Sequence, residues 1–190
     1  LDCIPLEHQQ RDITVLYPHA GSKRLSSLSA VLSSRRMAFF NCVSNDMNEN
    51  DKVNVAEAGL VAECLISLRE LYRLEGRTLT MEDIGIIVPY RNQISVIASK
   101  MAEYGLEGFD ERSIDTVERY QGSQRDIIFY VFTVRRLFQL SFLSASTYVE
   151  RNDAEKPYPV DRKLNVALTR AREQCFLIGN ADLLSHNPMY

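Results

Sequence analysis

The sequence predicts a layered α/β domain in which helices cover a mostly parallel sheet. Short apolar runs of buried-strand length alternate with segments whose apolar residues recur at helical spacing. The elements follow the order β-α-β-α-β-β-α-β, which favours parallel pairing through right-handed crossovers. The length of 190 residues, with 45% apolar and 25% charged residues, fits a single globular domain over 1–190.

The first quarter of the chain is a poorly defined entry segment, residues 1–50. Residues 13–17 could form a short strand, and the apolar run 37–43 (MAFFNCV) predicts a buried one. From 53 to 75 the apolar residues recur at helical spacing, and Gly76 stands where a helix C-cap belongs. These features predict the first strand-helix units of the domain.

The middle of the chain contains the clearest strand signals. Residues 84–88 (IGIIV) predict a buried strand that Pro89 ends, and 91–104 predict a helix with one apolar face. A short strand is expected at 114–117. The run 127–134 (IIFYVFTV) is rich in aromatic and β-branched residues and predicts the most strongly marked strand.

The last third begins with an irregular stretch, residues 135–159, which is Arg-rich, then Ser-rich, then contains two prolines. Such length is unusual for a connection in a compact domain, so we expect a functional, mobile or inserted segment. Residues 160–172 predict a helix, and 175–178 predict a final strand ended by Gly179.

Composition excludes several classes of protein. The net charge of −3 argues against a general polyanion binder, and no apolar run reaches the roughly 20 residues of a membrane helix. The 4 cysteines form no C-x-x-C pair, which predicts no metal site and reduced thiols in a cytoplasmic protein. Because the first residue is Leu rather than Met, we expect a fragment of a longer protein.

Ligands of parallel sheets sit beyond the carboxyl ends of the strands. This rule directs attention to three places, namely 89–93, 116–126 and the helix 161–172. In the first place, Arg91 and Gln93 occupy the first turn of a helix, where free N–H groups favour anions. Read alone, this segment favours an ordinary helix start over an anion site.

The second place is a Gln-Gly turn that enters the strongest strand. Gln121 and Gln124 could hold hydroxyl groups of a ligand, and Arg119 and Arg125 could pair with phosphates. The alternative is a solvated turn. In the third place, Leu164 and Leu168 face the core, with Lys163 and Arg170 roughly opposite, as in any amphipathic helix with a basic face.

Three strings in these places resemble the signature motifs of superfamily 1 helicases of the Upf-like group. LNVALTRAR (164–172) is similar to motif VI, IDTVERYQGSQRD (114–126) to motif V, and IGIIVPYRNQ (84–93) to the motif IV region. They occur in the family's order, and the resemblance covers about residues 50–184. It implies the second, C-terminal RecA-like domain of the motor, a three-layer α/β domain of the P-loop NTPase type.

The resemblance also implies a nucleotide site. ATP with Mg²⁺ would lie in the cleft between two RecA-like domains. Arg170 would be the catalytic arginine finger that reaches the γ-phosphate, and Gln121, Gly122 and Gln124 would lie near the nucleotide. The family usually has Glu at position 124, so the contact to the ribose would here be made by an uncharged amide.

A strand-binding track is implied at the motif IV turn and at the start of motif V. Pro89, Tyr90, Arg91 and Gln93 would line the track from the first of these and Thr116 from the second. The partner would be single-stranded DNA or RNA, and the family's direction of movement is 5′ to 3′. An aromatic side chain on such a track can stack on a base, and a basic one can pair with a phosphate.

The chain contains no G-x-x-x-x-G-K-[ST] sequence. The P-loop and the magnesium ligands are therefore expected on another domain, and this fragment alone is expected to be inactive. Two alternatives remain open at this point. One is a RecA-like docking module for nucleic acid or protein without motor action, and the other is an unrelated α/β nucleotide-binding enzyme.

Overall fold

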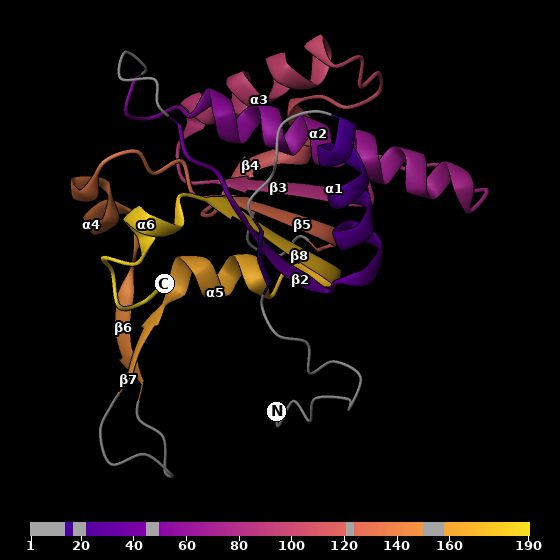
Figure 1. Cartoon of the computed structure of the whole chain (residues 1–190). Coiled ribbons are helices and arrows are strands. Elements are labelled where there is room, and N and C mark those ends of the chain that lie inside the picture. The colour runs from indigo at the N-terminus through magenta and orange to yellow at the C-terminus, as the bar shows by residue number, and fades with distance from the viewer. Residues whose placement is uncertain (1–13, 17–21, 45–49, 121–123, 150–157) are drawn as a thin grey trace.

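The computed structural model of the chain describes residues 14–16, 22–44, 50–120, 124–149 and 158–190. They form one sheet of 6 strands and a separate hairpin of 2 strands, with helices around the sheet (Figure 1). No helix within these ranges has the length and apolar character needed to cross a membrane.

All the pairings in the main sheet are parallel. In spatial order the strands are β1 (Thr14–Leu16), β2 (Met37–Asn41), β8 (Ala171–Gly179), β5 (Arg125–Val131), β3 (Ile84–Val88) and β4 (Ile114–Thr116). Because they run in one direction, their carboxyl ends share one edge of the sheet and their amino ends the other. We call these the carboxyl edge and the amino edge; the carboxyl edge lies on the left in Figure 1.

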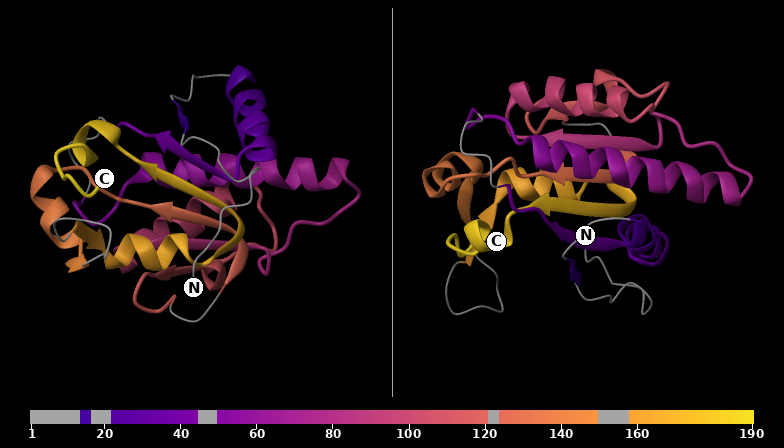
Figure 2. Two further views of the ribbon diagram at one scale, coloured as in Figure 1. Left: turned by 90° about the horizontal axis from the view of Figure 1, so that it is seen from below. Right: turned by 45° about the horizontal axis from the view of Figure 1, so that its top comes forward.

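Helices cover both faces of the sheet, which confirms the predicted three-layer α/β class. One face carries α1 (Ser22–Ser34), α2 (Val55–Leu74) and α3 (Arg91–Glu103), and the other carries α5 (Arg162–Leu168) and α6 (Ala181–Leu184) (Figure 2). Each face has its own apolar core, and α4 (Leu140–Leu143) joins the core under α5 and α6. The described residues also include the short 3₁₀ helices η2 (Glu111–Ser113) and η3 (Leu137–Gln139).

Local sequence explains several element boundaries. Gly76 has a φ of +71°, and its N–H donates to Arg73 O at 3.1 Å while Arg77 N donates to Tyr72 O at 2.8 Å. This pattern is a Schellman motif, which glycine favours because it lacks a Cβ, so the predicted C-cap of α2 is confirmed. In β3 all five residues are buried. A glycine is required at position 85, because an added Cβ would lie 2.0 Å from the Tyr120 hydroxyl.

The helix predicted over 160–172 is wrong at both ends. Residues Tyr158–Asp161 form β7, because they pair antiparallel with β6 (Ser146–Val149), and Asp161 then caps α5 by accepting from Lys163 N at 2.9 Å. The helix ends at Leu168, and β8 begins at Ala171 because it pairs with β5. Arg170 therefore lies beyond the helix and does not share a helix face with Lys163.

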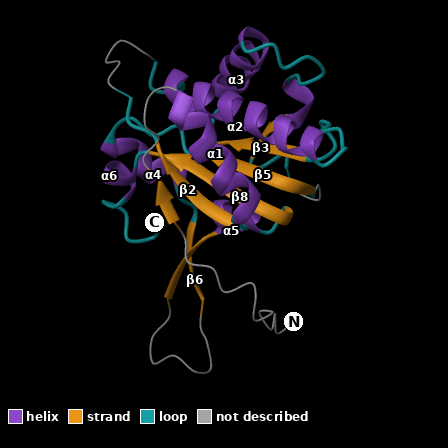
Figure 3. Cartoon of the chain, turned by 45° about the vertical axis from the view of Figure 1, so that its right-hand side comes forward, coloured by secondary structure: helices purple, strands orange, loops and turns teal. Residues whose placement is uncertain are grey.

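Other departures concern the connections. The stretch 135–159, expected to be irregular, contains η3, α4 and the strand β6 of a projecting hairpin (Figure 3). The helices α1 and α6 were not predicted from the sequence. The central strand runs over 125–131 rather than 127–134 because Thr133, at a φ of +54°, leaves the extended conformation.

Candidate functional site

The predicted site residues separate to opposite edges of the sheet. The turn 89–93 follows β3 and Thr116 ends β4, so the expected strand-binding residues lie at the carboxyl edge. Gln124 and Arg170 precede β5 and β8, so they lie at the amino edge. The expectation that all three places gather at the carboxyl edge is wrong, because these two residues enter strands rather than leave them.

At the carboxyl edge, α3 begins without a side-chain cap. Its N-cap residue Tyr90 has extended backbone (φ −126°, ψ 132°) and makes no capping hydrogen bond, whereas Asn54, Asp161 and Asn180 cap α2, α5 and α6. Gln93 N donates to Tyr90 O at 3.0 Å, so the first-turn N–H groups of Arg91 and Asn92 are the ones left for an outside acceptor. Arg91 is exposed beside them, and Pro89 and Tyr90 are half-buried.

Gln93 lies in the same turn but points inward. Its side chain is 0% exposed; Oε1 accepts from Asn54 N at 2.7 Å and Nε2 donates to Asn54 O at 2.9 Å. The amide is occupied by the backbone that leads into α2, so the expected contact between Gln93 and a nucleic-acid strand is wrong. Gln93 instead positions the turn that carries Tyr90 and Arg91.

A buried carboxylate extends this network to the end of β5. Glu57, also 0% exposed, accepts from Asn54 Nδ2 at 2.9 Å and from Thr133 N at 2.8 Å. Gln139 Nε2 donates to Asp51 O at 2.5 Å and to Thr133 O at 3.3 Å. The network therefore fixes the starts of α2 and α3 and the segment after β5 relative to one another.

Glu57 and Gln139 were not predicted from the sequence. A signal for the first was present, since Asn54 and Glu57 have the spacing of a helix-capping pair, and the Asn54 side chain does accept from Glu57 N at 3.1 Å. Gln139 stands three residues after Arg136 and accepts from Arg136 N at 2.9 Å, which is also the spacing of a capping box. Its contacts with Asp51 O and Thr133 O have no local signal, because they form only when the chain folds back over these residues.

Thr116 ends β4 at the same edge and is 7% exposed. Its hydroxyl and Lys163 both hydrogen-bond to the carboxylate of Glu118, and the Lys163 Nζ to Glu118 Oε1 distance is 3.2 Å. Partial burial acts to raise the pKa of Glu118, but the hydrogen bonds prevail and lower it below its usual range. The turn after β4 is thereby tied to α5.

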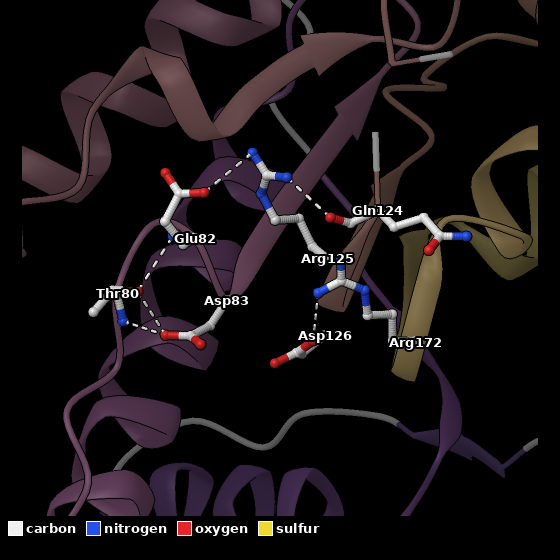
Figure 4. Close-up of polar contacts among 7 residues, drawn as sticks. All are labelled: Thr80, Glu82, Asp83, Gln124, Arg125, Asp126 and Arg172. Atoms are coloured by element: carbon white, nitrogen blue, oxygen red, sulfur yellow. Dashed lines mark hydrogen bonds and ion pairs between the residues drawn. The ribbon is translucent and has the colours of Figure 1, made fainter. Parts of the chain in front are cut away.

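At the amino edge, Arg170 and the start of β5 are in direct contact, because Arg125 N donates to Arg170 O at 3.1 Å. The basic side chains around this point have carboxylate neighbours. Arg125 lies 3.9 Å from Glu82 and donates to Gln124 O at 2.9 Å, and Arg172 lies 3.3 Å from Asp126 (Figure 4). The Gln124 side chain is exposed to solvent.

The Arg170 guanidinium differs from these neighbours. Its Nε donates to Val166 O at 3.3 Å and its Nη2 to Thr169 Oγ1 at 3.3 Å, both within its own turn. Across the described ranges, no carboxylate forms an ion pair with Arg170. An arginine left uncompensated beside an exposed amide suits an anionic ligand such as a nucleotide phosphate. Gln121 and Gly122, the other expected nucleotide contacts, lie outside the described residues.

A family model described as an AAA domain matches residues 18–182. The chain belongs to this family, as a C-terminal RecA-like domain of Upf-like superfamily 1 helicases. The resemblance noted from motifs IV to VI is thus confirmed. Within the described ranges, no group of three or more His, Cys, Asp or Glu side chains is placed to hold a metal ion.

The domain is similar to parts of several longer curated proteins. Regulator of nonsense transcripts 1 of Dictyostelium discoideum is 31% identical over 160 residues, which are 81% of this chain and 10% of that protein. The probable RNA helicase armi of Drosophila melanogaster is 30% identical over 86% of this chain and 13% of its own length. The bovine DNA replication ATP-dependent helicase/nuclease DNA2 is 35% identical over 56% of this chain and 8% of its own. The chain therefore spans about a tenth of the length of the relatives it matches.

Proposed function

We propose that the chain is the second motor domain of an ATP-dependent helicase or translocase that acts on single-stranded DNA or RNA. A P-loop domain of the same polypeptide would complete the ATP site against the amino edge. The nucleic-acid strand would lie along the carboxyl edge. ATP hydrolysis would then change the relation between the two domains and move the strand, in the 5′ to 3′ direction that the motifs imply.

The observation that carries the proposal is the uncompensated guanidinium of Arg170. Phosphoryl transfer develops negative charge, and an arginine supplied from a neighbouring domain stabilises it. A guanidinium already paired with a carboxylate would have to break that pair first. Among the described residues, Arg170 is held only by a carbonyl and a hydroxyl close to it in sequence, so it can reach across a cleft as the catalytic arginine finger.

Nucleotide contacts at the same edge would come from the motif V turn. We assign Gln124, together with Gln121 and Gly122, to the sugar side of ATP. When bound, ATP with Mg²⁺ supplies the reactive phosphate and its counter-ion. Because the sequence lacks a P-loop motif, we expect the magnesium ligands on the P-loop domain and no ATP turnover by residues 1–190 alone.

At the carboxyl edge we assign strand contacts to Pro89, Tyr90 and Arg91, with Thr116 at the neighbouring strand end. The uncapped first turn of α3 offers N–H groups to a phosphate, and exposed Arg91 adds a charge. Gln93 supports these residues from the interior. The cysteine pattern leads us to propose the cytoplasm as the compartment.

The test uses the polypeptide that joins this chain to its P-loop domain. Arg170→Ala should lower strand-stimulated ATP hydrolysis by at least about 10³-fold, the lower end of the effect of such residues. Strand affinity should stay nearly unchanged, because Arg170 lies at the opposite edge. The matched control is Arg172→Ala, which removes a neighbouring arginine that is paired with Asp126.

Two results would contradict the proposal. Retained ATP hydrolysis in Arg170→Ala would remove the arginine-finger role. Turnover by residues 1–190 above a blank without protein, surviving Arg170→Ala, would show that the chain carries a different active site. A parent polypeptide without a P-loop would favour the docking module instead.

A further inference from the structure

Three apolar side chains stand exposed on η3 and α4, next to the carboxyl edge. Leu137 is 50% exposed, Phe138 54% and Phe142 68%. Phe138 and Phe142 lie four residues apart and line an open hollow of about 910 Å³ with Tyr90, Lys52, Arg136 and Gln139. Exposed apolar clusters of this kind in soluble domains mark binding surfaces. We call Phe138, Phe142 and Tyr90 the aromatic ledge.

The ledge is held in place from beneath. Gln139 is 2% exposed and its Oε1 accepts from Arg135 N at 2.8 Å and Arg136 N at 2.9 Å, while its Nε2 donates to Asp51 O. Leu140 and Leu143 pack in the core under α5 and α6. Because Gln139, Leu140 and Leu143 are anchored inside, Phe138 and Phe142 are presented outward by the fold. Little ordering cost then remains for binding.

The surroundings of the ledge are basic. Lys52 and Arg136 line the hollow, and Arg91 follows Tyr90 directly. Arg136 Nε contacts Asp51 Oδ1 at 2.8 Å, but Lys52 and Arg91 are exposed and make no ion pair within the described ranges. The surface thus combines aromatic rings with an excess of positive charge, which is the combination that single-stranded nucleic acid requires.

We propose that the aromatic ledge binds the bases of the single strand, with Phe138 and Phe142 as stacking surfaces. This inference rests on the proposed function, because the ledge continues the assigned track from Tyr90 and Arg91. It adds to that function a base-contacting surface built from the long segment between motifs V and VI. A base can stack on an aromatic ring whatever its identity, so the ledge would hold the strand without reading its sequence.

The chain contains no tryptophan, which permits a direct test. Phe142→Trp and Phe138→Trp each introduce a single tryptophan on the ledge, whose fluorescence is excited selectively above the tyrosine band. Titration with a 15-nucleotide oligothymidylate or oligouridylate should quench the fluorescence, whereas an abasic oligomer of equal length should not. The control is Tyr148→Trp, an aromatic residue 74% exposed on the projecting hairpin, whose fluorescence should not change.

A second measurement uses Phe138→Ala and Phe142→Ala, separately and together. Each should weaken the affinity for base-containing oligomers about tenfold, within the usual range for a stacked base. The slope of log affinity against log salt should stay constant, because no phosphate contact is removed. Both side chains are exposed, so thermal unfolding should match the unaltered protein and exclude misfolding.

The outcomes separate this inference from the proposed function. If Arg91→Ala weakens strand binding but the phenylalanine variants do not, the ledge is refuted and the track stands. If the unaltered protein binds no strand at all, the proposed function fails and the ledge fails with it. A ledge tryptophan quenched equally by abasic oligomer would also refute stacking. If a protein partner quenches the ledge tryptophan and no nucleic-acid strand does, the ledge binds protein, and the proposal is refuted.

Discussion

The two edges of the sheet are built by different kinds of interaction. At the carboxyl edge, Asn54, Glu57 and Gln93 form a buried network in which side-chain amides and a carboxylate satisfy backbone groups. At the amino edge, exposed ion pairs such as Arg172 with Asp126 hold the surface. Buried networks are rigid because each broken hydrogen bond leaves a buried polar group without a partner. Exposed ion pairs break more easily because water can replace either partner. One edge is suited to hold a fixed track and the other to rearrange against a second domain.

The largest stability difference between the edges should come from Glu57. The substitution Glu57→Ala leaves the Thr133 N–H and the Asn54 amide without an acceptor and creates a cavity. We therefore expect a loss of about 3 kcal/mol in the free energy of unfolding. Asp126→Ala, which breaks an exposed pair, should cost under about 1 kcal/mol. Urea unfolding of both variants measures the contrast, and equal losses would refute it.

A second comparison concerns Gln93 and Arg91, which lie in the same turn but should affect stability and strand binding differently. Gln93→Ala should destabilise the fold by about 1–3 kcal/mol, because Asn54 N–H and C=O lose their partner. Arg91→Ala should leave the unfolding midpoint unchanged, weaken strand binding and reduce the salt slope by about 1. Urea unfolding and fluorescence anisotropy at several salt concentrations separate the two. An Arg91 variant that unfolds as early as the Gln93 variant would contradict the division of roles.

The amino edge allows a gain of function. Gln124→Glu places a carboxylate where the family usually has one, and we expect the KM for ATP to fall about twofold to tenfold, since hydrogen bonds to charged acceptors are stronger. The effect should vanish with 2′,3′-dideoxy-ATP, which lacks the ribose hydroxyls. A gain that persists with this analogue would show that residue 124 does not meet the sugar.

The smallest effect concerns the pair between Glu118 and Lys163. The pKa of Glu118 is lowered in the folded chain, so its contribution is present above the ordinary carboxyl pKa and is lost as the pH falls through the folded value. The Glu118 side chain is 59% exposed, so we expect under about 1 kcal/mol. Glu118→Gln should be less stable than the unaltered chain at pH 7 and equal to it at about pH 3, measured by urea unfolding. A difference that persists in acid would contradict this account.

Much of the fold could be predicted because its signals are local. The apolar run 84–88 is a strand buried on both faces, and the periodicity from 53 to 75 is the helix α2 with the Gly76 cap. The errors lie where distant pairing decides the outcome. Residues 160 and 161 were expected to begin a helix, but they belong to β7, which pairs with 146–149. Thr133 leaves the direction of the central strand, and its N–H donates to Glu57. Neither partner can be read from neighbouring residues.

For the candidate site, the sequence by itself determined the family and the residue types. The reason is that three motifs occur in the family's order and contain the glutamines and arginines of the site. Only the tertiary structure decided where these residues stand. It placed Arg170 beyond α5, turned Gln93 inward and set Phe138 and Phe142 outward beside Tyr90. The physical reason is that exposure and pairing depend on strand direction and on contacts across the sheet, which local periodicity does not encode.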